Sequence, residues 1–341
     1  MSGLGLTFLR RGNLAHPTAG GDYILSENRG DPEVFRILMS KGVSSDGIGI
    51  TIADAAQVTS IAGWFRENTI IESFNELRYF TSLTSLYGTT TSNGEFYQCT
   101  NLRSVVLPES MTSIGASAFG KCESLISIGA TPNVTTIGNG AFEGCSALLV
   151  DLNFPKLQAL GFSAVRMSGI LTFKAENYSG NIRANTFEAC PNLSSVIIPQ
   201  VKRIENTKAF YQCRALKNVD ISSVAYAGNT AFEECSGLET LNAPSLQTTG
   251  FSVFRGLTSL KWAKFGSTLT NIGVNGIENA TSLQYMIFES ANPPALYNAT
   301  TINNTNNCLI YVPDASLAAY QSANIWKDVV SRIKPLSEFN G

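Results

Sequence analysis

The chain has 341 residues, of which 44% are apolar and only 15% are charged. That length supplies a large core in one elongated domain or in two compact ones. The formal net charge is −2 with 24 lysines and arginines, which gives no overall electrostatic indication of binding to nucleic acid. No stretch approaches the roughly 20 apolar residues that cross a bilayer, so we expect no membrane insertion.

The first 30 residues are glycine-rich and contain little material for a core. Arg10 and Arg11 follow a short apolar run, which is the reverse of the order in a signal peptide, so we expect synthesis in the cytoplasm without export. Residues 1–30 are interpreted as an N-terminal arm. It is either a loose tail or an anchor to a larger assembly, and Arg10 and Arg11 are its candidate contacts.

Residues 31–63 predict a helical N-terminal cap. Asp31 precedes Pro32 in "DPEVFRILMSKG", and Gly42 follows, which is the pattern of a capped helix with its start and stop residues. A second helix is predicted after Thr51, with Asp54 in the capping-box position. Asp46 and Asp54 are the only oxygen ligands of a degenerate calcium loop in "SSDGIGITIADAA". Calcium needs six to eight oxygens, so we expect no metal site.

A Phe-x-x-Cys-x-x-Leu pattern dominates the rest of the chain, with successive copies 22 or 23 residues apart. Its central position is occupied, in chain order, by Cys99, Cys122, Cys145, Ser168, Cys190, Cys213, Cys235, Leu257 and Ala280. One such unit cannot bury its own apolar face, whereas stacked units bury a continuous one. We therefore predict a solenoid over residues 64–313. Its nine coils make a stack of about 45 Å at the usual strand spacing, preceded by a divergent coil at Phe65.

Each repeat continues in the same way after its leucine. A β-branched run, such as "LRSVVLP", predicts a short strand, and an apolar pair such as Met111 and Ile114 follows. Glycines at 115, 138, 161 and 273 are expected to supply turns with positive φ. The Ala-Phe segment is predicted to close the coil as a short helical turn. The expected fold is an α/β repeat solenoid with short strands and helical turns, capped at both ends.

The recurring cysteine has three possible interpretations: a disulfide partner, a metal ligand or a packed core residue. Ser168, Leu257 and Ala280 replace it without loss of the period, and neither Leu nor Ala can serve as a metal ligand or a disulfide partner. A small buried group can be replaced in this way, and free cysteine is among the most buried residue types. We therefore predict a structural core column with no metal and no disulfides. It contains Cys99, Cys122, Cys145, Cys190, Cys213 and Cys235.

Residues 314–341 predict a helical C-terminal cap. Ile310 and Val312 are expected to form the last strand, and Asp314 or Ser316 to begin a helix through Tyr320. Trp326 and Ile333 are expected to cover the final coil.

The stretch "LRSVVLPESMTSIGASAFGKCESL" resembles the BspA-type leucine-rich repeat, and the resemblance covers about residues 60–313. It implies a right-handed leucine-rich solenoid without catalysis, often a surface adhesin or binding scaffold, and it carries no catalytic residues. The opening "GLGLTFLRRG" resembles the start of proteins encoded by phages and prophages of gut Bacteroides, which implies a virion component.

Enzyme chemistry finds little support in the sequence. His16 is the only histidine and lies in the arm, which leaves none for a triad in the folded body. Paired carboxylates for glycoside cleavage stay open, because the spatial pairing of 26 acidic residues is not visible in a sequence. We predict no enzyme and no cofactor. A carbohydrate-active β-helix enzyme is the less favoured alternative.

A binding surface is predicted from the residues two positions after each leucine, which should point outward. They are Ser104, Ser127, Phe173, Ser195, Asn218, Thr240, Trp262 and Tyr285. Trp262 and Tyr285 should be neighbours on adjacent coils, with Lys261 and Lys264 flanking Trp262. Exposed aromatic residues beside polar groups suit contacts with carbohydrate or protein. The alternative is that loops of the caps cover them.

Two settings fit a binding solenoid. The first is a phage virion protein, held to other virion proteins by residues 1–30 and displayed on the particle to contact a host-surface protein or glycan. The second is an adhesin on the bacterial cell surface. The apparent lack of an export signal favours the first.

Overall fold

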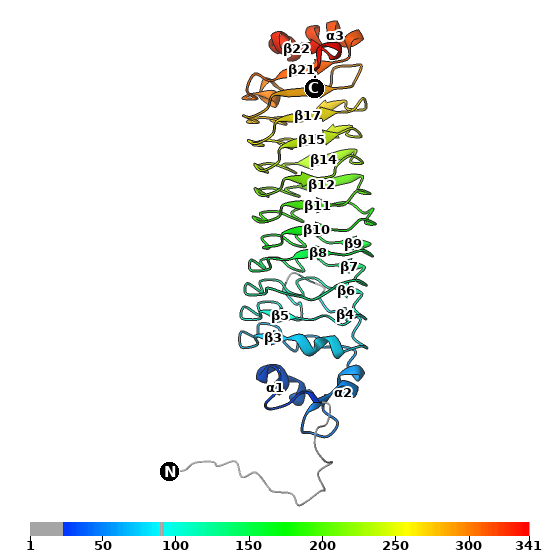
Figure 1. Cartoon of the computed structure of the whole chain (residues 1–341), viewed down its shortest axis with the longest axis vertical. Coiled ribbons are helices and arrows are strands. Elements are labelled where there is room, and N and C mark those ends of the chain that lie inside the picture. The colour runs from blue at the N-terminus through cyan, green and yellow to red at the C-terminus, as the bar shows by residue number, and fades with distance from the viewer. Residues whose placement is uncertain (1–22, 89, 91, 341) are drawn as a thin grey trace, which may run out of the picture.

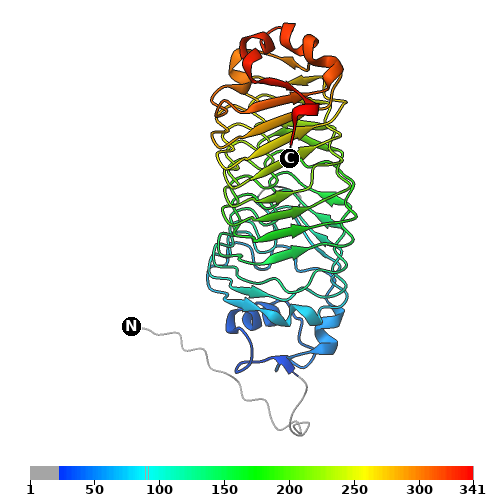
Figure 2. The ribbon, with the colours of Figure 1, turned by 45° about the horizontal axis from the view of Figure 1, so that its top comes forward.

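The computed structural model describes residues 23–88, 90 and 92–340. Arg10, Arg11, His16 and most of the predicted arm lie outside these residues. The chain forms one elongated stack of coils, with α1 and α2 at its N-terminal end and α3 at its C-terminal end (Figure 1). Two hydrogen-bonded ladders of parallel strands run along the stack on different sides, as the turned view also shows (Figure 2).

The first ladder contains the strands that follow the repeated leucines. They are β3 (Ser73–Phe74), β5 (Ser104–Val105), β8 (Asp151–Asn153), β10 (Thr172–Lys174), β11 (Ser195–Ile197), β13 (Asn218–Val219), β15 (Thr240–Ala243), β17 (Trp262–Phe265), β19 (Tyr285–Phe288), β21 (Leu309–Val312) and β22 (Ile333–Pro335). The second ladder contains the strands at the apolar pairs. They are β4 (Ser85–Leu86), β6 (Ser113–Ile114), β7 (Thr136–Ile137), β9 (Ala159–Leu160), β12 (Arg203–Thr207), β14 (Tyr226–Asn229), β16 (Thr248–Thr249), β18 (Asn271–Ile272) and β20 (Ala295–Leu296).

The third side of each coil from Phe96 to Ala280, which we call the turn face, consists of turns and contains no helix among the described residues, so the predicted helical turns are wrong there. Alternate backbone amides pair with the next coil: the Ser117, Phe119 and Lys121 N–H groups donate to the Asn139, Ala141 and Glu143 carbonyls at 2.6–2.8 Å. They are therefore unavailable for bonds within a helical turn. Two residues per coil, four apart, have left-handed φ. The first set is Ser117, Gly140, Ser163, Asn185, Lys208, Thr230, Ser252 and Asn275, and the second is Lys121, Gly144, Met167, Ala189, Gln212, Glu234, Gly256 and Asn279.

The glycines after the second-ladder strands serve a purpose other than the predicted one. Gly115, Gly138, Gly161 and Gly273 are not among the residues with positive φ. A Cβ at Gly138 would lie 2.5 Å from the Ala116 backbone nitrogen, and one at Gly273 would lie 2.2 Å from the Gly250 carbonyl oxygen. These glycines are required because successive coils approach too closely for any side chain.

The core is a set of columns along the stack. The Phe96, Phe119 and Phe142 rings stack with centroids 5.3 and 5.4 Å apart, and a second run joins Phe187, Phe210 and Phe232 at 4.8 and 4.9 Å. Val165 interrupts the column between the two runs. Phe65 stacks on Phe96 at 5.4 Å and so occupies the phenylalanine position of the divergent first coil.

The cysteine column lies beside these rings, and its six thiols are buried and free. Each thiol donates a hydrogen bond at 2.9–3.0 Å to the carbonyl at the phenylalanine position of the preceding coil, for example Cys122 Sγ to Phe96 O. Burial raises the pKa of Cys99 to about 12, which keeps the thiol neutral. The sequence predicted only a small buried group at this position. Cysteine supplies that small volume and, in addition, a hydrogen bond between successive coils.

The N-terminal end begins with β1 (Tyr23–Leu25) paired antiparallel to β2 (Ile50–Thr51). The two predicted helices are confirmed as α1 (Pro32–Ser40) and α2 (Ile52–Gln57), with the Asp31 cap and the Thr51–Asp54 capping box. Asp31 also accepts hydrogen bonds from the Glu72 and Ser73 backbone N–H groups at 2.8 and 3.0 Å, so one carboxylate joins α1 to the first coil. A 3-10 helix, Asn75–Tyr79, follows β3.

The C-terminal end differs from the prediction of a purely helical cap after a last strand at Ile310 and Val312. Ile333 lies in a further strand, β22, which pairs in parallel with β21. The helices there are α3 (Leu317–Ser322) and the 3-10 helices Ala299–Ile302, Asp314–Ser316, Trp326–Arg332 and Leu336–Glu338. Trp326 is buried as predicted: its ring meets Phe288 edge-on at 5.1 Å, and its Nε1 donates to the Pro294 carbonyl.

One-residue changes in spacing occur in both ladders. The inward residues Leu152, Phe173 and Val196 are in register. Phe173 is fully buried, so its predicted outward position is wrong. The spacing slips by one residue in this coil: Ile170 is buried in the leucine position and Leu171 is 38% exposed, which leaves Thr172 facing outward.

In the second ladder, Tyr178 and Ile182 are one residue further apart than Met111 and Ile114. Within the described residues, β9 accordingly has no strand partner on its C-terminal side.

Candidate functional site

The outward face of the first ladder changes character along the stack. The outward residues that open β8, β10, β11 and β13 are in register with one another and are small and polar: Asp151, Thr172, Ser195 and Asn218. Those that open β15, β17, β19 and β21 are Thr240, Trp262, Tyr285 and Leu309, again in register. Both predicted aromatic residues therefore lie side by side in one outward column, each partly exposed.

Tyr285 is partly covered by the C-terminal segment. The Phe339 ring lies 4.9 Å from the Tyr285 ring and 4.9 Å from the Tyr311 ring, measured between centroids. The Ser337 N–H donates to Asp314 and fixes the segment that carries Phe339. Within the described part of the chain, no aromatic or cationic group packs on the Trp262 ring. The expectation that loops cover these aromatics therefore holds for Tyr285, through the Phe339 ring.

The two flanking lysines are engaged in ion pairs. Lys261 Nζ lies 2.6 Å from a Glu239 carboxylate oxygen, and Lys264 Nζ lies 2.7 Å from Glu289. The hydrogen bond from Lys261 lowers the pKa of Glu239. Each lysine is thereby neutralised by an acid on a neighbouring coil, and the surface around Trp262 has no excess of positive charge.

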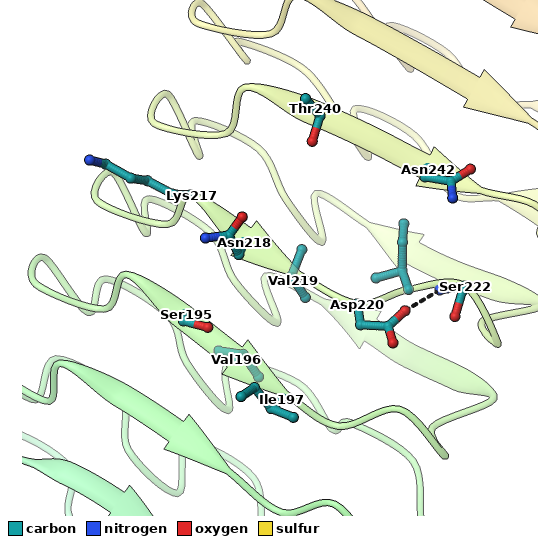
Figure 3. A pocket seen from close by; sticks show the side chains of 11 residues that line it. Ser195, Val196, Ile197, Lys217, Asn218, Val219, Asp220, Ser222, Thr240 and Asn242 are labelled. Carbon is teal, nitrogen blue, oxygen red and sulfur yellow. Dashed lines mark hydrogen bonds between the residues drawn. The ribbon is translucent and has the colours of Figure 1, made fainter.

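A polar depression of about 300 Å³ lies on the same face, over β11, β13 and β15 (Figure 3). Its polar rim is formed by Ser195, Lys217, Asn218, Asp220, Thr240 and Asn242. Val219 lies at the centre of the group, and the Asp220 carboxylate accepts a hydrogen bond from the Ser222 N–H at 2.9 Å. Sequence reasoning named Ser195, Asn218 and Thr240 as outward residues but did not predict a hollow between them.

The turn face carries a ladder of alternating charge that sequence analysis missed. Arg166 bridges Glu143 and Glu188 at 2.8 and 2.7 Å, and Arg255 bridges Glu233 and Glu278 at 2.8 and 2.9 Å. The signal was present in the sequence, because each of these residues directly follows the phenylalanine position of its repeat. These pairs link coils to one another and leave few free charges along that side.

The residues of the degenerate calcium loop make hydrogen bonds within the protein. Asp46 accepts from the Ile48 and Gly49 N–H groups and from the Tyr23 hydroxyl, and these bonds, the Tyr23 one foremost, lower its pKa to about 2. Asp54 serves the α2 capping box. Across residues 23–88, 90 and 92–340, no three His, Cys, Asp or Glu side chains are grouped so as to hold a metal ion. The same residues contain no helix long and apolar enough to cross a membrane.

A family model described as the BspA type leucine-rich repeat region matches six copies over residues 89–207 and 180–303. The chain belongs to this family. Among solved structures, the BspA-type chain is similar to a leucine-rich repeat protein from Bacteroides ovatus, with 20% identity and a TM-score of 0.48 over 68% of this chain and 69% of that one. It is also similar to a leucine-rich cell surface protein from Faecalibacterium prausnitzii, with 16% identity and a TM-score of 0.39 over 77% and 81%. No curated protein sequence matches it.

Proposed function

We propose that this BspA-type solenoid is a non-catalytic binding module, displayed on a surface, that contacts its partner through the outward face of the first ladder around Trp262. Leucine-rich repeats generally mediate protein interactions, and BspA-type repeat proteins are typically found at cell surfaces. The family offers no catalytic residues to place on the fold. The partner is a host-surface protein or glycan.

The observation that carries this proposal is the change in the outward column at Trp262 and Tyr285. Aromatic side chains on an outward strand position contribute little to the core, whereas they are enriched among residues that dominate binding energy. Lys261 and Lys264 are ion-paired, so we assign them to the polar surroundings of the Trp262 contact. Contact through Trp262 and through the uncovered edge of Tyr285 then gives an apolar centre with a polar surround.

Binding to fixed cells tests the proposal with the substitution Trp262→Ala, using bacterial cells for the virion setting and epithelial cells for the adhesin setting. We expect at least a tenfold loss of affinity, because central aromatic anchors contribute about 2 kcal/mol or more. Tyr297→Ala is the matched control, since Tyr297 is 65% exposed and directly follows β20 of the second ladder. Unchanged binding of the Trp262→Ala protein, or an equal loss in both variants, would contradict the assignment.

The surface that carries the module is the second part of the proposal. The resemblance of the first residues to phage-encoded proteins supports a virion, with residues 1–30, including Arg10 and Arg11, as the anchor to other virion proteins. The alternative, a bacterial cell-surface adhesin, agrees with the usual location of the family. Quantitative mass spectrometry of purified phage particles and washed cell envelopes separates the two, and enrichment in envelopes would overturn the virion assignment.

A further inference from the structure

The depression over β13 exists because the first ladder opens there. Strand β13 has only two residues, and within the described residues no ladder pair joins it to β15. Asp220 occupies the position that Ile197 holds in the preceding coil, and its carboxylate accepts a hydrogen bond from the Ser222 N–H at 2.9 Å. Such a local side-chain bond competes with strand pairing, so the chain turns away from β15.

The walls of the opening carry several polar side chains whose hydrogen-bonding groups have no partner among the described residues. The side chains of Ser195, Asn218, Thr240 and Asn242 make no hydrogen bond with any other described residue, and all four line the depression (Figure 3). Each of these side chains both donates and accepts. On the same face, the Thr172 hydroxyl instead donates to the Asp151 carboxylate at 2.7 Å.

The charge of the depression is balanced. Asp220 and Lys217 are its only charged lining residues and have opposite signs. The nearby Lys261 is paired with Glu239. Without a net charge, the site offers nothing specific to an anionic or cationic ligand. Paired amides, hydroxyls and one carboxylate instead match a molecule that presents many hydroxyl groups.

The depression is continuous with the aromatic column. Thr240 on its wall is in register with Trp262, and Trp262 with Tyr285. At the usual strand spacing, the span from Ser195 to Trp262 is about 14 Å. An aromatic side chain at the end of a row of amides and hydroxyls suits a chain of sugar rings, because each ring has apolar faces and polar edges.

We propose that the first ladder binds a neutral oligosaccharide that lies along the solenoid axis, with its hydroxyl groups in the depression at Asn218 and Asn242 and one ring against Trp262. The inference rests on the proposed function and specifies its ligand as a glycan. A protein partner is the competing class and is an outcome of the test.

The test uses a printed array of neutral and anionic oligosaccharides of defined structure, probed with the full chain. We expect binding to neutral members, reduced at least tenfold by Asn218→Ala combined with Asn242→Ala. Asn192→Ala is the matched control, because Asn192 is exposed, makes no hydrogen bond with a described residue and lies outside the depression. Thermal unfolding of all variants shows whether the double substitution preserves the fold; both asparagines are exposed, so we expect it to.

Binding restricted to anionic glycans, or neutral binding that the double substitution leaves unchanged, would overturn the inference. The same holds if no glycan on the array binds while bacterial or epithelial cells are bound in a manner that survives periodate oxidation, which destroys the vicinal diols of sugars. That last result would leave the proposed function intact, with a protein partner. Failure to bind cells at all would instead count against the proposed function.

Discussion

Two stretches of the first ladder, β8–β13 and β15–β22, have the same apolar character at their inward positions and differ in their outward residues. Inward positions are apolar in both, with Leu152 and Phe173 in the first stretch matched by Leu241 and Met286 in the second. The outward residues that open the strands are small and polar in the first, whereas Trp262 and Tyr285 open strands in the second. The stack fixes what points inward, because every coil must fill the same cross-section. Outward positions are free of that constraint and are where binding properties can differ.

The largest expected effect comes from breaking an inward column. Cys122→Arg places a charge among neutral, fully buried neighbours, and we expect a loss of more than about 4 kcal/mol in the free energy of unfolding. Thermal or denaturant unfolding measures it. Cys122→Ser is the control: it keeps a donor for the Phe96 carbonyl and should cost about 1–2 kcal/mol. An arginine variant as stable as the serine variant would contradict the packed column.

The next effect concerns Glu95, a buried acid in the small-residue column of Ala118 and Ala141. Burial raises its pKa from 4.5 to about 7. The folded state therefore binds more protons than the unfolded state between these values. The contribution of Glu95 to stability is greatest below about pH 4.5 and falls as the pH rises to about 7, in total by about 3 kcal/mol. Glu95→Gln keeps an acceptor for the Tyr87 N–H and removes the charge.

We therefore expect Glu95→Gln to be about as stable as the wild type at pH 4.5 and more stable by about 3 kcal/mol at pH 8. Urea denaturation at the two pH values measures the difference. Parallel stability–pH profiles for the two proteins would show that Glu95 is not held in a neutral form.

The smallest effect tests why the two stretches of the ladder are separate. Asp220→Ile removes the side-chain acceptor that bonds the Ser222 N–H and gives β13 the residue type found at Ile197. We expect β13 to pair with β15 and stability to rise by about 0.5–1 kcal/mol. Amide hydrogen exchange in peptides covering 217–221 and 239–243 should slow. Unchanged exchange in both peptides would mean that Asp220 does not open the ladder.

The predictable part of this molecule is its periodic part. The Phe, Cys and Leu columns follow from recurrence every 22 or 23 residues, and the α1 and α2 caps follow from local side-chain chemistry at Asp31 and Thr51. The turn face was predicted as helical because its sequence permits a helix, whereas the amides at Phe119 and Lys121 bond to the next coil. That competition is decided between coils and is not visible within one repeat.

The candidate site was predictable only in part. Adjacency of Trp262 and Tyr285 follows from the period alone. The slip at Ile170, which turns Phe173 inward, arises from a one-residue change in spacing that the central position of the repeat does not reveal. The cover over Tyr285 depends on Phe339, more than 50 residues away in the chain. The depression depends on a missing strand pair, which a search for repeats does not detect.

Hydroxyl-radical footprinting of the protein bound to fixed bacterial or epithelial cells, whichever bind it, tests the central claim most directly, because it reports the solvent access of individual aromatic side chains. Trp262 should be protected from oxidation on binding, while Tyr87 and Tyr297, which are 52% and 65% exposed outside the first ladder, should be oxidised as in the free protein. Protection of Tyr87 or Tyr297 with Trp262 unchanged would place the binding surface on another side of the solenoid and contradict the account.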